Sequence, residues 1–494
     1  MNRTGTINLS RGAIRYISYA VLAVIFSWVF ITGLQSIRNE RRLTFDCSLY
    51  DWLGSGLIKN PFNYSAASFW DKIKDRRPEG KEKTIAAYYL SAPLFKHPPV
   101  FSYMIAFSKC IFGDTPTASR LVNIFLRALT VLAVYVIAKE AMGPVWALLA
   151  ALFMAADPVY MFASQKVWID APMTFFVYAG LAFLAVSRER TFAVVLAAVC
   201  LSLSLLCKYV SAVVVIPAYF AVMMSGIVRD KRQFGIFIAI PVVMFIPWLL
   251  WNYAVYGNGF VAKMISFNAD TVTGQGPSLG LMTALFAAAC VLATLIAAIF
   301  FAGESSRRLG KRALKLIEES TSIVGYIKAI PIWTRVLVAV LLFLSRDGLM
   351  KAANIRYLPP TSDSMHMFDN EPAYFYFKHL IELSPLYVFS YVSFFAMHKW
   401  GKEMRLAGLV AAAALVFFGA FGYYETRYVL PAVPGLLLLA VFSIKTVVDY
   451  LRENGKGPER SAAYILFGLI AGFAILKTLY FDVSVVVKNN FIFF

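Results

Sequence analysis

AIRYISYAVLAVIFSWVFITG, residues 13–33, is the first of many long apolar runs in this chain of 494 residues. A run of about twenty apolar residues can cross the hydrocarbon core of a bilayer as a helix. Basic residues precede the run but no small-residue cleavage site follows it, so we predict a retained first span rather than a signal peptide. The span delivers the polar stretch Arg41-Arg-Leu-Thr-Phe-Asp46-Cys-Ser-Leu-Tyr50 to a membrane surface.

The composition excludes a soluble globular protein. Hydrophobic residues make up 60% of the chain, charged residues only 15%, and the mean hydropathy is +0.66. Apolar runs near twenty residues recur from end to end, and such runs are far too long for the strands of a membrane barrel. The sequence therefore predicts an all-α polytopic membrane protein.

The formal net charge of +19 does not indicate a nucleic-acid partner. Lysine and arginine gather at the ends of apolar runs, as membrane topology requires, and not along one polar domain. The five cysteines contain no CxxC pair, which argues against a zinc site or a disulfide framework. Four histidines are too few for a histidine-rich metal centre.

The distribution of charge predicts thirteen spans in one membrane domain, 1–494, with the N-terminus in the cytoplasm. This orientation places basic loops such as 303–328 in the cytoplasm, in agreement with the positive-inside rule. The apolar part of segment 98–112 is about a dozen residues and carries Lys109, so we interpret it as re-entrant or interfacial. The predicted spans are 13–33, 119–138, 144–163, 171–187, 191–207, 209–226, 234–254, 280–302, 329–345, 379–397, 406–424, 428–447 and 461–481.

Three polar segments then lie outside the membrane: the first outer loop 35–97 and the outer loops 255–279 and 346–378. Within the first of these, helical spacing puts Phe69, Trp70 and Ile73 on one face, with basic residues on the rest. Such a helix either lies on the membrane surface near anionic headgroups or is an ordinary solvated loop helix.

Two carboxylates on the predicted outer face are candidates for chemistry. Asp46 follows the first span, and Asp170 lies at the outer mouth of a later one. Two carboxylates facing one cavity can divide the work, one as a general base and the other to orient an acceptor or hold a metal. The alternative for Asp170 is a helix cap, which Pro172 in the first turn would suit.

Cations on the same face are candidates for an anionic substrate group. Lys208 and Arg427 each stand at the end of an apolar run, where they either bind an anion or extend to the headgroups. His97 precedes two prolines, which stiffen the backbone and hold the ring in position. Other residues expected around the cavity are Tyr50, Lys166, Glu425 and Tyr428.

Five stretches, in order, carry a family resemblance. They are Asp46-Cys-Ser-Leu-Tyr50, His97-Pro-Pro-Val-Phe-Ser-Tyr103 leading into 112–121, Ser164-Gln-Lys-Val-Trp-Ile-Asp-Ala-Pro-Met-Thr174, Leu205-Leu-Cys-Lys-Tyr209, and Arg427-Tyr-Val-Leu-Pro-Ala-Val-Pro434. With them the chain resembles the C-type integral-membrane glycosyltransferases that use lipid-phosphate sugars. It is most similar to the group with protein O-mannosyltransferases and the aminoarabinose transferase of lipid A.

Two departures from the family pattern stand at the candidate site. Cys47 occupies the position where the family usually has a glutamate, and His97 the position where the lipid A relatives have a lysine. Phosphate binding by His97 would therefore depend on its protonation.

The resemblance implies an inverting sugar transfer from a polyprenyl-phosphate donor to a lipid, glycan or protein acceptor. It implies Asp46 as the base, Asp170 as the acceptor-orienting carboxylate, and Lys208, Arg427 and His97 on the phosphate side. No cofactor is required, although a divalent metal is compatible with the residues. The expected location is a bacterial inner membrane with the site facing the periplasm or outside. A transporter or flippase of a lipid-linked glycan is the alternative, and it would place charges around the bilayer midplane in repeated halves.

Overall fold

The structure is a computed structural model that describes residues 11–39, 43–76, 81–187, 190–225, 227–228, 230–264, 367–369, 374–420, 423–454 and 457–488. The predicted spans 280–302 and 329–345, the loop 303–328 and most of the outer loops 255–279 and 346–378 lie outside the described residues.

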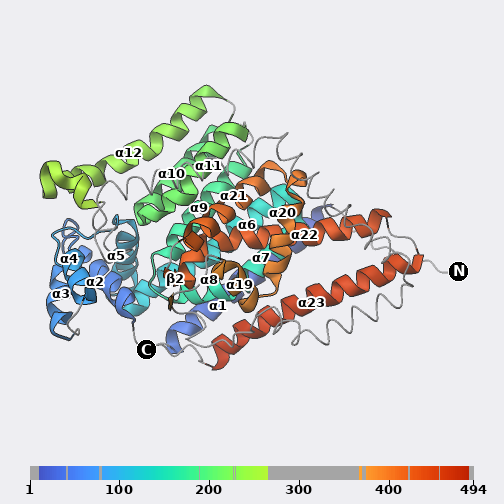
Figure 1. Ribbon diagram of the computed structural model, residues 1–494, viewed down its shortest axis with the longest axis horizontal. Coiled ribbons are helices and arrows are strands. Elements are labelled where there is room, and N and C mark those ends of the chain that lie inside the picture. Colours follow the sequence, from blue (N-terminus) through green and yellow to red (C-terminus); the bar gives the residue numbers. More distant parts are fainter. Residues whose placement is uncertain are drawn as a thin grey trace.

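The described chain is almost entirely helical (Figure 1). The first helix and the outer loop form α1 (Arg11–Asn39), α2 (Phe45–Lys59), α3 (Ala67–Ile73), η1 (Lys74–Arg76), α4 (Lys81–Leu90) and α5 (Val100–Phe112). The bundle continues with α6 (Pro116–Met142), α7 (Pro144–Ala155), α8 (Pro158–Gln165), α9 (Asp170–Ala185), α10 (Thr191–Cys207), η2 (Tyr209–Ser211), α11 (Ala212–Ser225), α12 (Lys231–Tyr256) and η3 (Gly257–Gly259). The C-terminal part contains β1 (Met367–Asp369), α19 (Phe375–Leu383), α20 (Leu386–Phe395), η5 (Met397–Lys399), α21 (Lys402–Ala420), β2 (Tyr423–Glu425), η6 (Thr426–Ala432), α22 (Val433–Asn454) and α23 (Gly457–Lys488).

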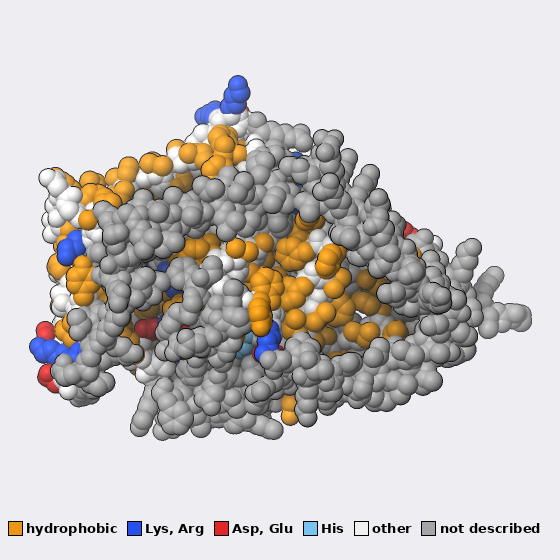
Figure 2. Space-filling model, in the orientation of Figure 1, with side chains coloured by type: hydrophobic (Ala, Val, Ile, Leu, Met, Phe, Trp, Pro, Cys, Tyr) orange, Lys and Arg blue, Asp and Glu red, His pale blue; other side chains and the backbone are white. Residues whose placement is uncertain are grey.

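Within the described residues, four helical segments are long and apolar enough to cross a membrane, and a bent pair makes a fifth. Several shorter apolar helices accompany them, and the total of thirteen spans stays a prediction. Figure 2 shows hydrophobic side chains along α12, where Val242, Val243 and Leu250 are exposed. An exposed apolar surface on a long apolar helix is the surface that lipid covers.

The span predicted at 144–163 is two helices, α7 and α8, bent by 54°. The break falls at Asp157, which precedes a proline and whose side chain caps α8 by accepting a hydrogen bond from the Tyr160 N–H at 2.8 Å. The Tyr387 hydroxyl donates to the other Asp157 oxygen at 2.6 Å. Arg127 donates to the carbonyl oxygen of Ala155, the last residue of α7, also at 2.6 Å. Because these groups satisfy both ends of the break, the chain can change direction between α7 and α8 within the bundle.

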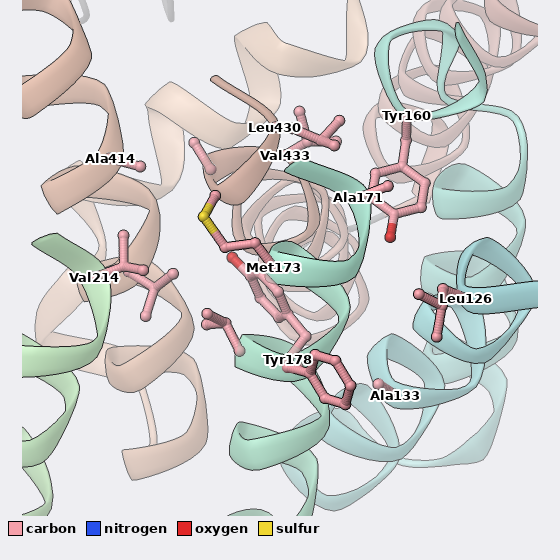
Figure 3. Packing of buried hydrophobic residues seen from close by; sticks show 14 of the residues in the cluster. Leu126, Ala133, Tyr160, Ala171, Met173, Tyr178, Val214, Ala414, Leu430 and Val433 are labelled. Atoms are coloured by element: carbon pink, nitrogen blue, oxygen red, sulfur yellow. The ribbon is translucent and has the colours of Figure 1, made fainter. Parts of the chain in front are cut away.

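The core packs α9 against the segment that follows β2 (Figure 3). The Tyr178 hydroxyl donates to the Pro431 carbonyl at 3.0 Å and accepts from the Gly435 N–H at 2.8 Å. A side chain at Gly435 would begin 2.5 Å from the Ala407 carbonyl oxygen, so only glycine permits this close approach of α22 and α21. The contact fixes the start of α22, and with it η6, against α9.

The helix that carries Phe69 and Trp70 packs its apolar face on protein. Phe69 and Trp70 are buried, and the Phe69 ring packs against Phe45 at 5.8 Å and Trp52 at 6.2 Å. This apolar face therefore packs α3 against α2. α5 is exposed through Phe107, Ile111 and Phe112, whereas its Lys109 is buried. At 13 residues it is short compared with a bilayer core.

One feature departs from an all-helical chain. β1 and β2 form an antiparallel ribbon in which Met367 pairs with Glu425 and Asp369 with Tyr423. This ribbon joins residues 367–369 to the residues immediately before Arg427.

Candidate functional site

The first turn of α2 is fixed to the segment between α8 and α9 through Cys47. Its sulfur accepts hydrogen bonds from the Thr44 hydroxyl at 3.0 Å and from the Val167 N–H at 3.3 Å. Asn123 on α6 holds the same segment by donating to the carbonyls of Lys166 and Trp168, at 2.6 and 2.8 Å. Asp46 is thereby set beside residues that lie more than a hundred positions away in the sequence.

Asp46 forms an ion pair with Arg427 of η6. Arg427 NH1 donates to Asp46 Oδ2 at 2.6 Å, and Arg427 Nε lies 2.8 Å from Glu425 Oε2. Burial alone would raise the pKa of Asp46, but the guanidinium of Arg427 lowers it below the ordinary value. Burial raises the pKa of Glu425, although Arg427 opposes this shift.

The second carboxylate, Asp170, begins α9 and pairs with Lys208. The ammonium of Lys208 lies 2.8 Å from Asp170 Oδ1. Ile169 holds the N-cap position and Asp170 is the first residue of the helix, so the Asp170 side chain acts here through its ion pair with Lys208 and not as an N-cap. Asp170 Oδ2 is buried without a hydrogen-bond partner among the described residues.

Aromatic rings connect the two ion pairs. The guanidinium carbon of Arg427 lies 4.9 Å from the ring centre of Trp168 and 5.5 Å from that of Tyr428. The Lys208 ammonium lies 5.0 Å from the same Tyr428 ring. Cation–π contacts of this kind hold charged groups in place where little water reaches them.

The loop before α5 brings a third cation to the site, Lys96. Its ammonium lies 3.9 Å from the Tyr89 ring, and no carboxylate of the described chain forms an ion pair with it. Burial lowers the pKa of Lys96 to about 7, assisted by the charges of Lys208 and Arg427 and opposed by Asp46. The loop is fixed at Leu94, whose N–H donates to the Tyr256 hydroxyl while that hydroxyl donates to the Leu94 carbonyl, at 3.3 and 3.1 Å.

His97 lies next to Lys96 but is not a cation. Its ring packs edge-on against Phe95 at 5.6 Å. Burial lowers the pKa of His97 well below its ordinary value, and Lys96, Lys208 and Arg427 lower it further. The neutral ring can therefore contribute a hydrogen bond to a phosphate but not a charge.

The remaining residues predicted around the cavity occupy different places. Glu425 and Tyr428 are in contact with Arg427. Tyr50 is buried behind Asp46 with its ring 5.1 Å from that of Phe101, and Lys166 is buried with its ammonium 5.7 Å from the Phe162 ring. Both side chains are thus buried against aromatic rings.

Sequence reasoning missed Lys96 and Trp168. His97 has a sequence signal because two prolines follow it, whereas the adjacent Lys96 has none. Trp168 lies within one of the five stretches that carry the family resemblance, but its contact with a distant arginine arises only when the chain folds.

At full ionisation the site holds three cations, Arg427, Lys208 and Lys96, and three carboxylates, Asp46, Asp170 and Glu425. Two of the cations are paired with carboxylates, whereas Lys96 is available to an anion. Among the described residues, no three histidine, cysteine or acidic side chains are grouped as metal ligands. The arrangement can bind a phosphate beside a carboxylate that accepts a proton.

Comparison with known proteins gives a family match for part of the chain. Residues 96–251 match the family model described as dolichyl-phosphate-mannose-protein mannosyltransferase. Lys96, His97, Asp170 and Lys208 lie inside the matched segment. No curated protein sequence matches the chain.

Solved structures resemble the whole chain. ArnT from Cupriavidus metallidurans in the apo state superposes with a TM-score of 0.53 at 11% identity, covering 95% of this chain and 77% of that chain. The same protein bound to undecaprenyl phosphate gives 0.49 at 12% identity, with 96% and 78% covered. The archaeal oligosaccharyltransferase AglB from Archaeoglobus fulgidus, in complex with an inhibitory peptide and a dolichol-phosphate, gives 0.49 at 15% identity, with 97% and 56% covered.

The fold is thus that of the C-type membrane glycosyltransferases, as predicted, and the predicted resemblance is confirmed. The chain is an integral membrane protein with a helical bundle of this class.

Proposed function

We propose that this protein transfers a sugar from a polyprenyl-phosphate carrier to a lipid, glycan or protein acceptor at the outer face of the membrane. One observation carries the proposal: Asp46, Asp170 and the cations Lys96, Lys208 and Arg427 meet from five separate segments of the chain. The family model over residues 96–251 supports a lipid-phosphate sugar as the donor class. A bacterial inner membrane, with the site facing the periplasm, is the location that we propose.

In the proposed reaction, the acceptor hydroxyl oxygen attacks the anomeric carbon of the donor sugar. Its proton passes to the carboxylate of Asp46 while the bond from the anomeric carbon to the phosphate oxygen breaks. The electron pair of that bond goes to the phosphate, and attack from the opposite side inverts the anomeric centre. Lys96, Lys208 and Arg427 stabilise the charge that develops on the leaving phosphate.

Asp170 fits the role of orienting the acceptor. Its Oδ1 is held by Lys208, and its buried Oδ2 accepts no hydrogen bond from the described residues. A buried carboxylate oxygen without a donor is costly, and a hydroxyl of the acceptor would satisfy it. Because Lys and Arg already provide positive charge, the proposed mechanism needs no metal.

The test supplies radiolabelled polyprenyl-phosphate sugars to the purified full-length protein, with membrane lipid, glycan and protein fractions as acceptors. We expect label to appear in one fraction and to depend on Asp46. The matched control is Asp71→Asn, which removes an exposed carboxylate that pairs with Lys74 at the surface. Movement of a lipid-linked glycan across vesicles without any transfer would instead support the transporter.

A further inference from the structure

The ion cluster holds the proposed base in a state that is unsuited to catalysis. Asp46 Oδ2 accepts a hydrogen bond of 2.6 Å from Arg427 NH1, and this guanidinium stabilises the carboxylate as an anion. A carboxylate stabilised in this way accepts a proton poorly. Another group must take up the charge of Arg427 before Asp46 can act as a base.

Arg427 is fixed by contacts that do not involve Asp46. Its guanidinium carbon lies 4.9 Å from the Trp168 ring centre and 5.5 Å from that of Tyr428, and its Nε lies 2.8 Å from Glu425 Oε2. The Glu425 side chain is only 11% exposed. These three neighbours hold the guanidinium in place whichever group binds NH1.

Asp46 is the partner that a ligand can reach. Its side chain is 35% exposed, more than those of its ion-paired neighbours Arg427 and Glu425, and it lies in the first turn of α2. A short aspartate side chain can leave a guanidinium by a rotation of its own, without movement of the helix.

We infer that Arg427 is a shared counter-ion that the donor phosphate takes from Asp46, so that the base is released only when the donor is bound. Glu425 is a positioning residue in this exchange, because it keeps Arg427 oriented and divides its charge. The inference rests on the proposed function, since the phosphate is that of the donor. Only an ion pair is exchanged, and no covalent bond changes.

The chemistry of the two anions favours the exchange. A guanidinium binds two phosphate oxygens through parallel N–H donors, whereas NH1 has one hydrogen bond to Asp46. Lys96, which has no carboxylate partner among the described residues, adds positive charge for the phosphate nearby. The consequence is an order of events: without donor, Asp46 does not activate a hydroxyl or water.

The test measures the protonation of Asp46 directly, in the full-length protein in lipid nanodiscs. A carbodiimide labels protonated carboxyl groups, and peptide mass spectrometry gives the labelled fraction at residue 46 across a pH series. The probe is undecaprenyl phosphate, with its binding measured by radiolabel in the same samples. The titratable and charged groups that interact electrostatically with Asp46 are Arg427, Lys96, Lys208, Glu425, Cys47 and Tyr50.

With bound phosphate, we expect the labelling midpoint of Asp46 to rise by one pH unit or more, which is about tenfold more labelling at a fixed pH above the midpoint. In Arg427→Gln the midpoint should already be high and should no longer respond. Asp114, which is paired with Lys109 away from the cluster, is the internal control and should not respond.

Glu425→Gln separates a positioning role from a structural one. With Glu425 neutral, the charge of Arg427 acts on Asp46 alone, so the donor-free midpoint should fall further. A purely structural role would lower stability and leave that midpoint unchanged, which would overturn the role of Glu425.

Two other outcomes overturn the inference and can be told apart. Bound phosphate with an unchanged Asp46 midpoint would reject the exchange and leave the proposed function standing. A protein that does not bind undecaprenyl phosphate would reject both the exchange and the proposed donor class.

Discussion

Helix α2 presents two carboxylates, Asp46 and Asp51, little more than one turn apart, and each meets a cation from a distant segment. Asp51 pairs with Lys109 of α5 at 2.8 Å and accepts a hydrogen bond from the Ser119 hydroxyl at 2.7 Å. Lys109, which is 1% exposed, also pairs with Asp114 at 2.8 Å and donates to Ser55 at 2.7 Å. We call these residues the Lys109 clamp.

The Lys109 clamp differs from the cluster around Asp46 in how fully its groups are satisfied. In the clamp, one buried ammonium meets two carboxylates and a hydroxyl, and the result ties α2 to α5 and α6. Around Asp46, the pKa of Lys96 is lowered, Asp170 Oδ2 lacks a partner within the described chain, and aromatic rings hold Arg427. The comparison teaches that a satisfied ion cluster stabilises a fold, whereas incompletely paired charge is available to a ligand.

The largest expected effect is on activity, at Asp46, the first of the two carboxylates of α2. Asp46→Asn keeps the shape of the side chain but removes its proton acceptor, so transfer should fall by a factor on the order of 10²–10⁴, the usual range for a general base. Donor binding should be retained or become tighter, because the donor phosphate no longer competes with an Asp46 carboxylate for Arg427. Radiolabel transfer, with Asp71→Asn as the control, measures the effect. Equal transfer rates in Asp46→Asn and wild type would move the base to Asp170.

The next effect tests the clamp. Lys109→Met leaves Asp51 and Asp114 without their cation, which should destabilise the protein by about 2–3 kcal/mol, below the usual cost of breaking a fully buried pair because Asp114 is 48% exposed. Thermal unfolding in nanodiscs measures it. The kcat of the protein that remains folded should equal that of wild type, and a large loss of kcat at unchanged stability would assign the clamp to the site.

A smaller effect concerns the cation that the sequence did not single out. Lys96 is protonated below its pKa of about 7, so kcat/KM for the donor should fall as pH rises through that value. Lys96→Arg stays charged and should lose this dependence, because arginine does not titrate in this range. Lys96→Ala should raise the donor KM by about tenfold at pH 6, in keeping with one charge-assisted hydrogen bond.

If the fall in kcat/KM with rising pH persists unchanged in Lys96→Arg, a group other than Lys96 produces it. Lys74→Ala serves as the matched control, since that lysine is an exposed surface residue paired with Asp71.

The smallest effect concerns His97. Its ring is neutral near pH 7, so His97→Asn should retain hydrogen-bonding ability and change the donor KM only about two- to threefold, less than the loss of a net hydrogen bond. Donor saturation curves at pH 6 and 8 should show the same ratio to wild type. A ratio that grows sharply at pH 6 would mean that His97 is charged when it binds the donor.

Much of the fold followed from local pattern. The apolar runs predicted α1, α6, α10 and α12, because an apolar helix must be surrounded by protein or by lipid along its length. The break between α7 and α8 was missed because Asp157-Pro158 was treated as part of one apolar run. The burial of Phe69 was also missed, since an apolar face can pack on protein or on lipid and spacing alone does not distinguish them.

The site was predicted in part. Asp46, Asp170, Lys208 and Arg427 were selected because ionisable residues at helix ends in a membrane protein are few. Their pairing was not predictable. No local pattern in the sequence indicates that Asp46 pairs with Arg427, 381 positions later, or that Asp170 pairs with Lys208.

By itself, the sequence determined the class of this protein: its hydropathy requires a membrane, and its helix periodicity requires a bundle, because backbone groups in lipid must be satisfied within each segment. The tertiary structure alone decided which charges are partners. Three hydrogen bonds set the distances between helix ends: from the Val167 N–H to Cys47, from Asn123 to the Trp168 carbonyl, and from the Gly435 N–H to Tyr178. Electrostatic energy depends on those distances and on burial. The lowered pKa values of Lys96 and His97 therefore arise only in the folded chain.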